Sequence, residues 1–183
     1  MSFNFPLTAK PAAFTDGGTL HHKPSASSSA SDYDFLQGHH SIRHKKLKQR
    51  LNGCTEWIDT EGSKITEKIL GGIGNVEKHC LKEPGGKQIE AVALRLFSLS
   101  TRLWSLYWAD SLTGTLDPPL HGSFEGNLGV FFGTDYFKGE ETLVQFQYDR
   151  TNPEEPVWGQ AYSNDRGVTW EWNWFMFYKR CDA

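Results

Sequence analysis

No stretch of this sequence reaches the roughly 18 consecutive apolar residues that a membrane-spanning helix needs. The first residues also lack the basic start and apolar stretch of a secretory signal. Excess positive charge is missing as well, because the net charge is −3. Without a global basic field, neither nucleic acid nor a membrane surface is expected as a partner.

Cysteine is scarce, with only Cys54, Cys80 and Cys181, and these form no CxxC pair. An odd number of scattered cysteines fits a reducing compartment better than a disulfide framework, so we predict a cytoplasmic protein. The motifs GxGxxG, GxSxG and HExxH and the phosphate-binding P-loop are absent too. We therefore expect no cofactor and no metal site.

What the sequence does contain is enough for one domain. It has 183 residues, of which 38% are hydrophobic and 14% aromatic, including seven Trp. Residues 1–31 are rich in Ser and Ala, without periodicity, and are predicted to be a disordered tail. Residues 32–180 keep one texture throughout and are predicted to form a single domain.

That texture is one of strands and turns. Segments rich in β-branched and aromatic residues alternate with clusters of Gly, Pro, Asn and Asp: 74–81, 89–97, 101–109, 129–137, 141–149, 157–163 and 169–179. About ten short strands joined by short turns predict an all-β fold, a single antiparallel up-and-down barrel, which leaves no exposed sheet edge. Tyr33, Phe35 and Leu36, just before the first strand, are expected to form a short N-terminal plug.

Bulky side chains fall on both faces of the last strand. Strict alternation places Trp170, Trp172, Trp174, Met176 and Tyr178 on one face, and Glu171, Asn173, Phe175 and Phe177 on the other. Mixed side chains of this kind favour a barrel wide enough to enclose a ligand cavity.

The stretch SNDRGVTW (163–170) is similar to the Asp-box that sialidase propellers repeat. It occurs once, and the chain is too short for a propeller. A Gly in a short connection between two strands is the usual hairpin solution, so we predict a structural turn here.

Several blocks resemble, in order, an uncharacterised bacterial family of lipocalin-like (calycin) domains: DYDFLQG, LGGIGN, LWSLYWADSLTGTLDPP and TWEWNW. The resemblance covers about residues 32–180. It implies a closed barrel with a small-molecule cavity and no known reaction. Family members carry a Trp two residues after the glycine that Gly38 matches, and this chain has His40 there.

Alternation also predicts candidate site residues. Asn75, Glu77 and His79 share one face of a strand, where Glu77 and His79 could act as a general acid/base pair. Arg95 lies on a face with the small Ala91 and Ala93, which leaves room for it to bind a carboxylate or phosphate. A structural ion pair with Glu77 is the alternative.

An aromatic wall is predicted from Trp158, Gln160 and Tyr162, which alternate on one face, together with Tyr107. Core packing is the alternative for these residues. Asn173, between tryptophans, must either pair with a neighbour or contact the ligand, because a buried amide is costly when unpaired.

The basic stretch HHSIRHKKLKQR (39–50) lacks the interleaved aromatic residues of a nucleic-acid site. Its His40 and His44 would lie about 13 Å apart on a strand, too far to share a metal ion. We expect a solvated strand.

Three hypotheses follow for function. The preferred one is a binding protein whose ligand is a partly apolar small molecule. Whether this ligand carries an anionic group stays open. The second is a cofactor-free enzyme, an isomerase, cyclase or hydrolase, that uses Glu77 and His79. The third and weakest is a haem-binding barrel of the nitrobindin type, with His79 or His121 as the iron ligand. A homodimer stays open.

Overall fold

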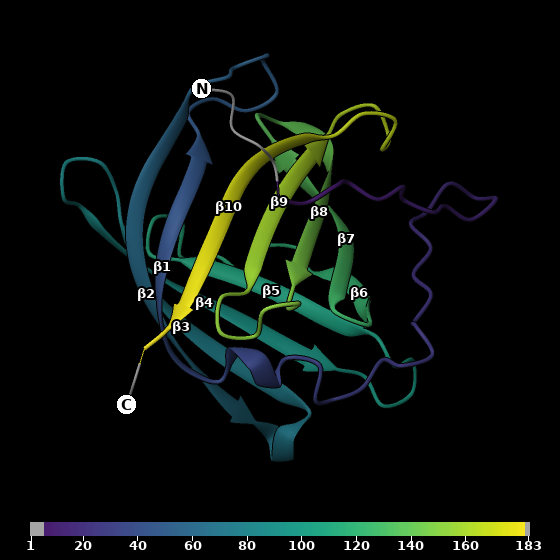
Figure 1. The fold of residues 1–183 in the computed structure, drawn as a ribbon. Helices are drawn as coiled ribbons and strands as arrows, with labels where there is room; N and C mark the ends of the chain where they lie inside the picture. Colours follow the sequence, from purple (N-terminus) through teal and green to yellow (C-terminus); the bar gives the residue numbers. More distant parts are fainter. Residues whose placement is uncertain (1–5, 182–183) are drawn as a thin grey trace.

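The computed structural model describes residues 6–181, in which ten antiparallel strands close into a barrel (Figure 1). The strands are β1 (Gly38–Leu47), β2 (Trp57–Ile69), β3 (Gly74–Lys82), β4 (Gln88–Phe97), β5 (Trp104–Asp110), β6 (Leu120–Glu125), β7 (Leu128–Phe137), β8 (Glu140–Asp149), β9 (Val157–Ser163) and β10 (Glu171–Arg180). Each strand pairs with the next, and β1 pairs with β10. The predicted up-and-down barrel is confirmed. No helix within residues 6–181 has the length and apolar character to cross a membrane.

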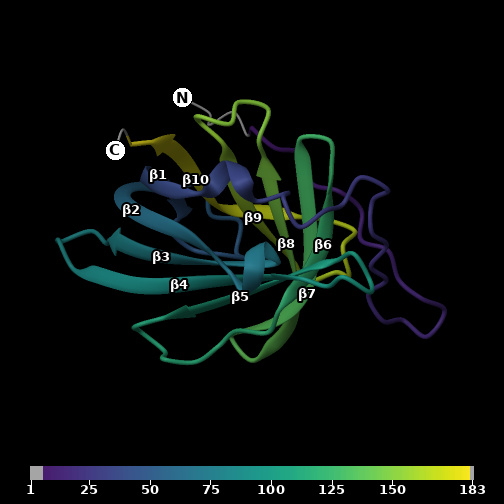
Figure 2. The ribbon, with the colours of Figure 1, turned by 90° about the horizontal axis from the view of Figure 1, so that it is seen from below.

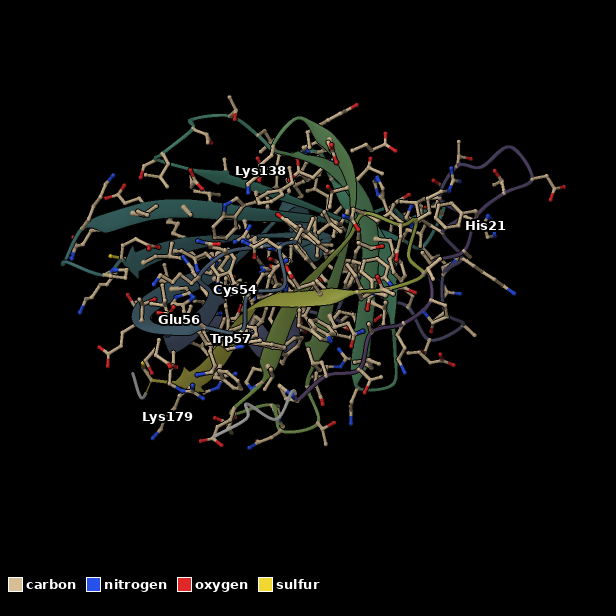
Figure 3. All side chains as sticks on the ribbon, turned by 90° about the horizontal axis from the view of Figure 1, so that it is seen from above. His21, Cys54, Glu56, Trp57, Lys138 and Lys179 are labelled. Atoms are coloured by element: carbon tan, nitrogen blue, oxygen red, sulfur yellow. The ribbon has the colours of Figure 1, made fainter. Side chains whose placement is uncertain are left out.

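Up-and-down topology sorts the connections between the two ends of the barrel. The β1–β2, β3–β4, β5–β6, β7–β8 and β9–β10 connections lie at one end, which we call the mouth. Figure 3 looks from above, with Glu56 of the β1–β2 connection and Lys138 of the β7–β8 turn labelled. The other connections lie at the opposite end, where the chain enters β1.

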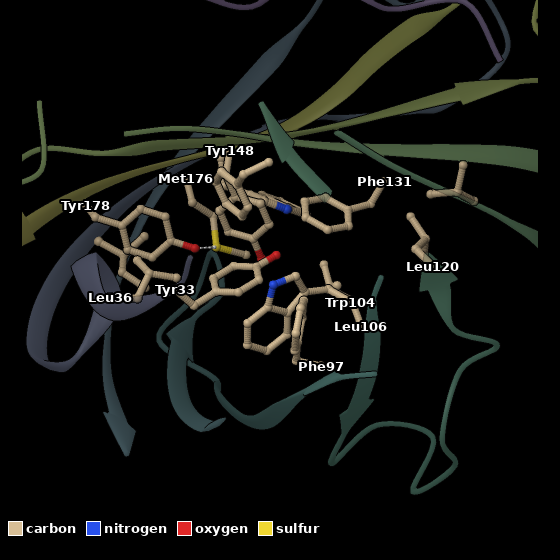
Figure 4. Close-up of a cluster of buried hydrophobic side chains, with 14 of the residues drawn as sticks. Tyr33, Leu36, Phe97, Trp104, Leu106, Leu120, Phe131, Tyr148, Met176 and Tyr178 are labelled. Atoms are coloured by element: carbon tan, nitrogen blue, oxygen red, sulfur yellow. Dashed lines mark hydrogen bonds between the residues drawn. The ribbon is translucent and has the colours of Figure 1, made fainter. Parts of the chain in front are cut away.

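The opposite end is closed by residues 33–36, which we call the plug. They include the short 3-10 helix η1 (Asp34–Leu36), which lies across this end beside β1 and β10 (Figure 2). Tyr33 and Leu36 are 1% and 0% exposed, whereas Phe35 is half-buried. Tyr33 reaches in among Trp104 and Met176 (Figure 4). The expected plug is therefore present. A second 3-10 turn, η2 (Leu70–Gly72), joins β2 to β3.

Strand alternation fails at one place in β10. The register shifts between Trp172 and Trp174, with Asn173 as the extra residue. As a result Trp172 packs against Phe175 on the outer side, at a ring distance of 5.3 Å, while Trp174 faces the interior with Met176. The expected face shared by Trp172 and Trp174 is wrong, because a bulge reverses the alternation between them.

The basic strand β1 is not solvated on both faces, contrary to expectation. His40 and His44 point inward and are 1% and 0% exposed. His44 accepts a hydrogen bond from Trp174 Nε1 at 3.1 Å through Nδ1. Burial lowers the pKa of His40 to about 4 and that of His44 to about 3, so both rings are neutral near pH 7.

The β9–β10 connection carries the single Asp-box and is built as a turn. Asp165 accepts hydrogen bonds from the Thr169 backbone N–H at 2.9 Å and from its hydroxyl at 2.5 Å. These bonds, with one from Ser163, lower the pKa of Asp165 to about 2. Gly167 has a φ of 85°, which a residue with a side chain adopts only with strain. All of these groups satisfy the turn itself.

Residues 6–31, for which the sequence predicts disorder, run along the outside of the barrel (purple in Figure 1). The Gln145 side chain bonds both the N–H and the carbonyl of Lys10, at 2.9 and 2.7 Å. Gln147 Nε2 donates to the Thr8 carbonyl at 2.9 Å. Leu7 is 6% exposed and packs against an outer cluster that includes Trp172. The outward-facing side chains of β8 are thus covered by specific contacts with the N-terminal segment. Residues 1–5 lie outside the described part.

Candidate functional site

The barrel encloses a cavity of about 280 Å³ that extends from the mouth toward the plug. Its deeper wall carries Glu77, His79, Arg95, Leu106, Tyr148, Trp158, Met176 and Tyr178, and its middle carries Trp108, Val144, Phe146 and Trp174. The lining is therefore mostly apolar and aromatic, with charged groups gathered in the deeper part. This combination is typical of small-molecule sites.

Glu77 is the centre of the deeper wall, and both of its carboxylate oxygens are fully used. Oε1 lies 2.7 Å from His79 Nε2 and 2.8 Å from Arg95 Nη2. Oε2 accepts a hydrogen bond from Thr66 Oγ1 at 2.6 Å and lies 3.2 Å from Lys64 Nζ. Since a carboxylate offers about four acceptor positions, Glu77 has none left for a ligand.

The charges around Glu77 decide its ionisation. Burial alone would raise the pKa of this carboxyl, but the adjacent Arg95 and Lys64 outweigh that effect and hold it well below its usual range. Glu77 is consequently an anion near pH 7. Of the predicted acid/base pair, only His79 has a nitrogen, Nδ1, without a partner among residues 6–181.

Arg95 is fixed by its neighbours on two sides. Nη1 donates to Asn75 Oδ1 at 2.9 Å, and Nη2 donates to Tyr148 Oη at 3.2 Å as well as to Glu77. The guanidinium also lies 4.9 Å from the centre of the Tyr33 ring, which connects it to the plug. Asn75 does not line the cavity, and its part is to orient Arg95.

Lys64 also belongs to the buried cluster around Glu77, although the sequence analysis did not single it out. It lies on β2 opposite His79 of β3, with its side chain 0% exposed. It donates to Thr66 Oγ1 at 2.7 Å and to the Leu36 carbonyl of the plug. Burial lowers its pKa to about 8, against the opposing effect of Glu77. The sequence pattern that could have indicated the inward position of Lys64 is its alternation with Gly62 and Thr66 on one face of β2.

The predicted aromatic wall lies together along the cavity. Trp158, Gln160 and Tyr162 all line it from β9. Tyr107 also contributes to the lining, although its position in β5 alternates with the buried Leu106. Asn173 does not line the cavity: its Oδ1 accepts a hydrogen bond from Gln160 Nε2 at 2.8 Å, so it orients that amide from behind.

The mouth carries charges of its own. Asp110, Asp117 and Asp135 line it, and burial raises the pKa of Asp117 to about 6, with the other two carboxylates adding to the shift. Lys46 is paired with Glu83 at 2.7 Å, and Arg50 donates to Tyr162 Oη at 3.2 Å. Arg50 stays a cation, but the carboxylates of the mouth outnumber its cations, so the net charge there is negative.

The arrangement does not suit a shared metal ion, and only one of the two expected haem ligands lines the cavity. Residues 6–181 contain no group of three or more His, Cys, Asp or Glu side chains placed to share a metal ion. His121, one expected haem ligand, alternates with the buried Leu120 and Gly122 and bonds Ser105 Oγ at 3.0 Å, outside the cavity lining. His79 has Nε2 on Glu77 and its ring 5.1 Å from that of Trp108. Of the two histidines, only His79 lines the cavity, and its Nδ1 has no partner among residues 6–181.

In comparisons with known proteins, no protein-family model matches the chain, and no curated protein sequence matches it. The chemistry of the site therefore rests on its geometry.

Proposed function

We propose that this protein binds a small, partly apolar molecule inside its barrel. The carrying observation is the cavity of about 280 Å³, which combines an aromatic wall with a buried polar cluster at its deeper end. Apolar contacts would supply most of the affinity, and the few oriented polar groups would select and orient the ligand. Gln160, held by Asn173, and Arg95, held by Asn75, are two such groups.

The resemblance to lipocalin-like domains is part of the same proposal, and the closed antiparallel barrel is compatible with it. We also propose a cytoplasmic location, which the free state of Cys54, Cys80 and Cys181 supports.

Ligand binding can be tested through the cavity itself. A library of small metabolites is screened by thermal shift, and hits are confirmed by native mass spectrometry. Ala93→Phe fills the cavity from β4, whereas Val92→Phe adds the same ring on the outer face, where Val92 is 41% exposed. We expect Ala93→Phe to abolish the shifts and Val92→Phe to keep them. Equal binding by both variants would contradict the proposal.

A second candidate function rests on the 2.7 Å contact between Glu77 and His79 Nε2. Glu77 would keep the proton of the imidazole on Nε2, so Nδ1 would be the free base, as in cofactor-free proton transfer. A suitable probe is 5-nitrobenzisoxazole. The base takes the proton from the ring carbon, the C–H electron pair forms the nitrile, and the N–O bond breaks to leave a phenolate.

The expected result for an enzyme is probe turnover that falls at least about tenfold in His79→Gln. Turnover no faster than with free imidazole, or unchanged in His79→Gln, would exclude this role and leave binding as the function.

A further inference from the structure

The deeper wall holds an uncompensated positive charge. Lys64, Glu77 and Arg95 have side-chain exposures of 0%, 0% and 2%. They contribute two cations and one carboxylate. The ion pairs of Arg150 with Asp32 and of Arg180 with Glu154 lie farther out, and they use their own partners. Within residues 6–181 no second carboxylate pairs with Lys64 or Arg95.

The nearby phenols do not supply the missing negative charge. Burial raises the pKa of Tyr33, Tyr148 and Tyr178, so all three stay neutral at physiological pH. Burying a charge without a counter-charge is among the most costly arrangements in a protein. A charge of one sign, enclosed beside a cavity, therefore indicates what the cavity is built to receive.

Unused hydrogen-bond donors point the same way. Arg95 Nε and Trp158 Nε1 are buried and have no partner among residues 6–181. Both groups can only donate, and both residues line the cavity. Glu77 cannot accept from them, because its two oxygens already hold four partners. The deeper end thus has two donors without an acceptor, beside a positive charge that no second carboxylate balances.

We infer that the ligand is a monoanion of the carboxylate class, bound with its carboxylate at Arg95 and its apolar body against Trp158 and Trp174. This inference rests on the proposed function and specifies its ligand. A planar guanidinium matches a carboxylate, and one ligand charge balances the one that is missing. The acidic mouth opposes retention of an anion there, so the anionic group belongs at the deeper end.

In this account Lys64 acts without touching the ligand. It neutralises Glu77 through Oε2 and so leaves the charge of Arg95 available to the cavity. In Lys64→Met, Glu77 would balance Arg95 alone, and the preference for an anion would fall. Lys68 is a matched control on the same strand, because it is 45% exposed and pairs with Asp34.

Calorimetric titration at pH 7 tests the inference with two matched pairs: octanoate with octanamide, and 2-naphthoate with 2-naphthamide. Of the two carboxylates, the one that the wild-type protein binds more tightly should bind at least about tenfold more tightly than its amide, as a charge-assisted bond requires. In Lys64→Met the ratio should fall to about threefold or less, and in Lys68→Met it should stay.

The wild-type comparison needs no variant to fold. If acid and amide bind equally, the inference is overturned and the proposed function stands. If none of the four compounds binds, the inference is overturned as well, and the thermal-shift screen of the metabolite library decides separately on the proposed function. If 2-naphthyl phosphate, a dianion, binds more tightly than 2-naphthoate, the count of one missing charge is wrong.

Discussion

Among single residues, Glu77 has the largest predicted effect on stability. Its replacement by Gln leaves Lys64 and Arg95 buried together without an anion. We expect Glu77→Gln to lower the free energy of unfolding by about 3–5 kcal/mol, as measured in urea, since breaking a buried ion pair from one side has that cost.

Lys64→Met provides the contrast, because it leaves the one-to-one pair of Glu77 and Arg95. Its cost should be at least about 2 kcal/mol smaller than that of Glu77→Gln. Equal losses in the two variants would mean that removing Lys64 leaves as much buried charge unbalanced as removing Glu77 does, which would contradict the charge count.

His40 makes stability depend on pH. Its pKa is about 4 in the folded protein and near 6.5 when exposed, so the unfolded chain binds more protons between these values. The contribution is complete above pH 6.5 and is lost as the pH falls toward 4. The His40→Leu variant should lose about 1–2 kcal/mol less than the wild type between pH 7.5 and pH 5. An identical loss in both proteins would refute this origin.

Among the elements, the plug is held through its main chain as well as its side chains. Arg180 donates to the Phe35 and Gln37 carbonyls at 2.9 and 3.0 Å, and Lys64 donates to that of Leu36. The fully buried Leu36 should cost about 2–5 kcal/mol when changed to Ala. The half-buried Phe35 should cost less, and the reverse order in urea unfolding would contradict this packing.

The outer N-terminal segment leads to a separate prediction. A chain that starts at Asp32 would uncover Gln145, Gln147 and the contacts of Leu7. We expect its melting temperature to fall by several degrees, because Leu7 alone buries apolar surface worth about 1.5–3 kcal/mol. Equal melting of the two chains would show that the contacts add nothing to stability.

An element can be predicted from the sequence where its physical cause leaves a local pattern of residues. The period-two patterns and the Gly-rich turns predict the strands, and alternation places Glu77 and His79 on one face of their strand. That this face and Arg95 point inward is seen only in the structure. The bulge at Asn173 leaves no pattern in the sequence, so strict alternation predicts the wrong face of the strand for Trp172. The covering of β8 depends on side chains about 135 residues away from Lys10 in sequence, which composition does not encode.

Over the whole molecule, closure of ten strands gives the barrel two unlike ends. The plug and the buried cations occupy one end, and Asp110, Asp117 and Asp135 line the mouth. A ligand that enters with its carboxylate first would therefore carry that group from negatively charged to positively charged surroundings. The sequence indicated a cavity but could not give this polarity, which depends on which loops share an end and on the inward position of Lys64.

The most direct test of the central claim is a crystal structure of the protein grown with 2-naphthoate. We predict density for the ligand inside the barrel, with its carboxylate on Arg95 and its rings against Trp158. An interior filled by side chains, or a ligand found only on the outer surface, would contradict it.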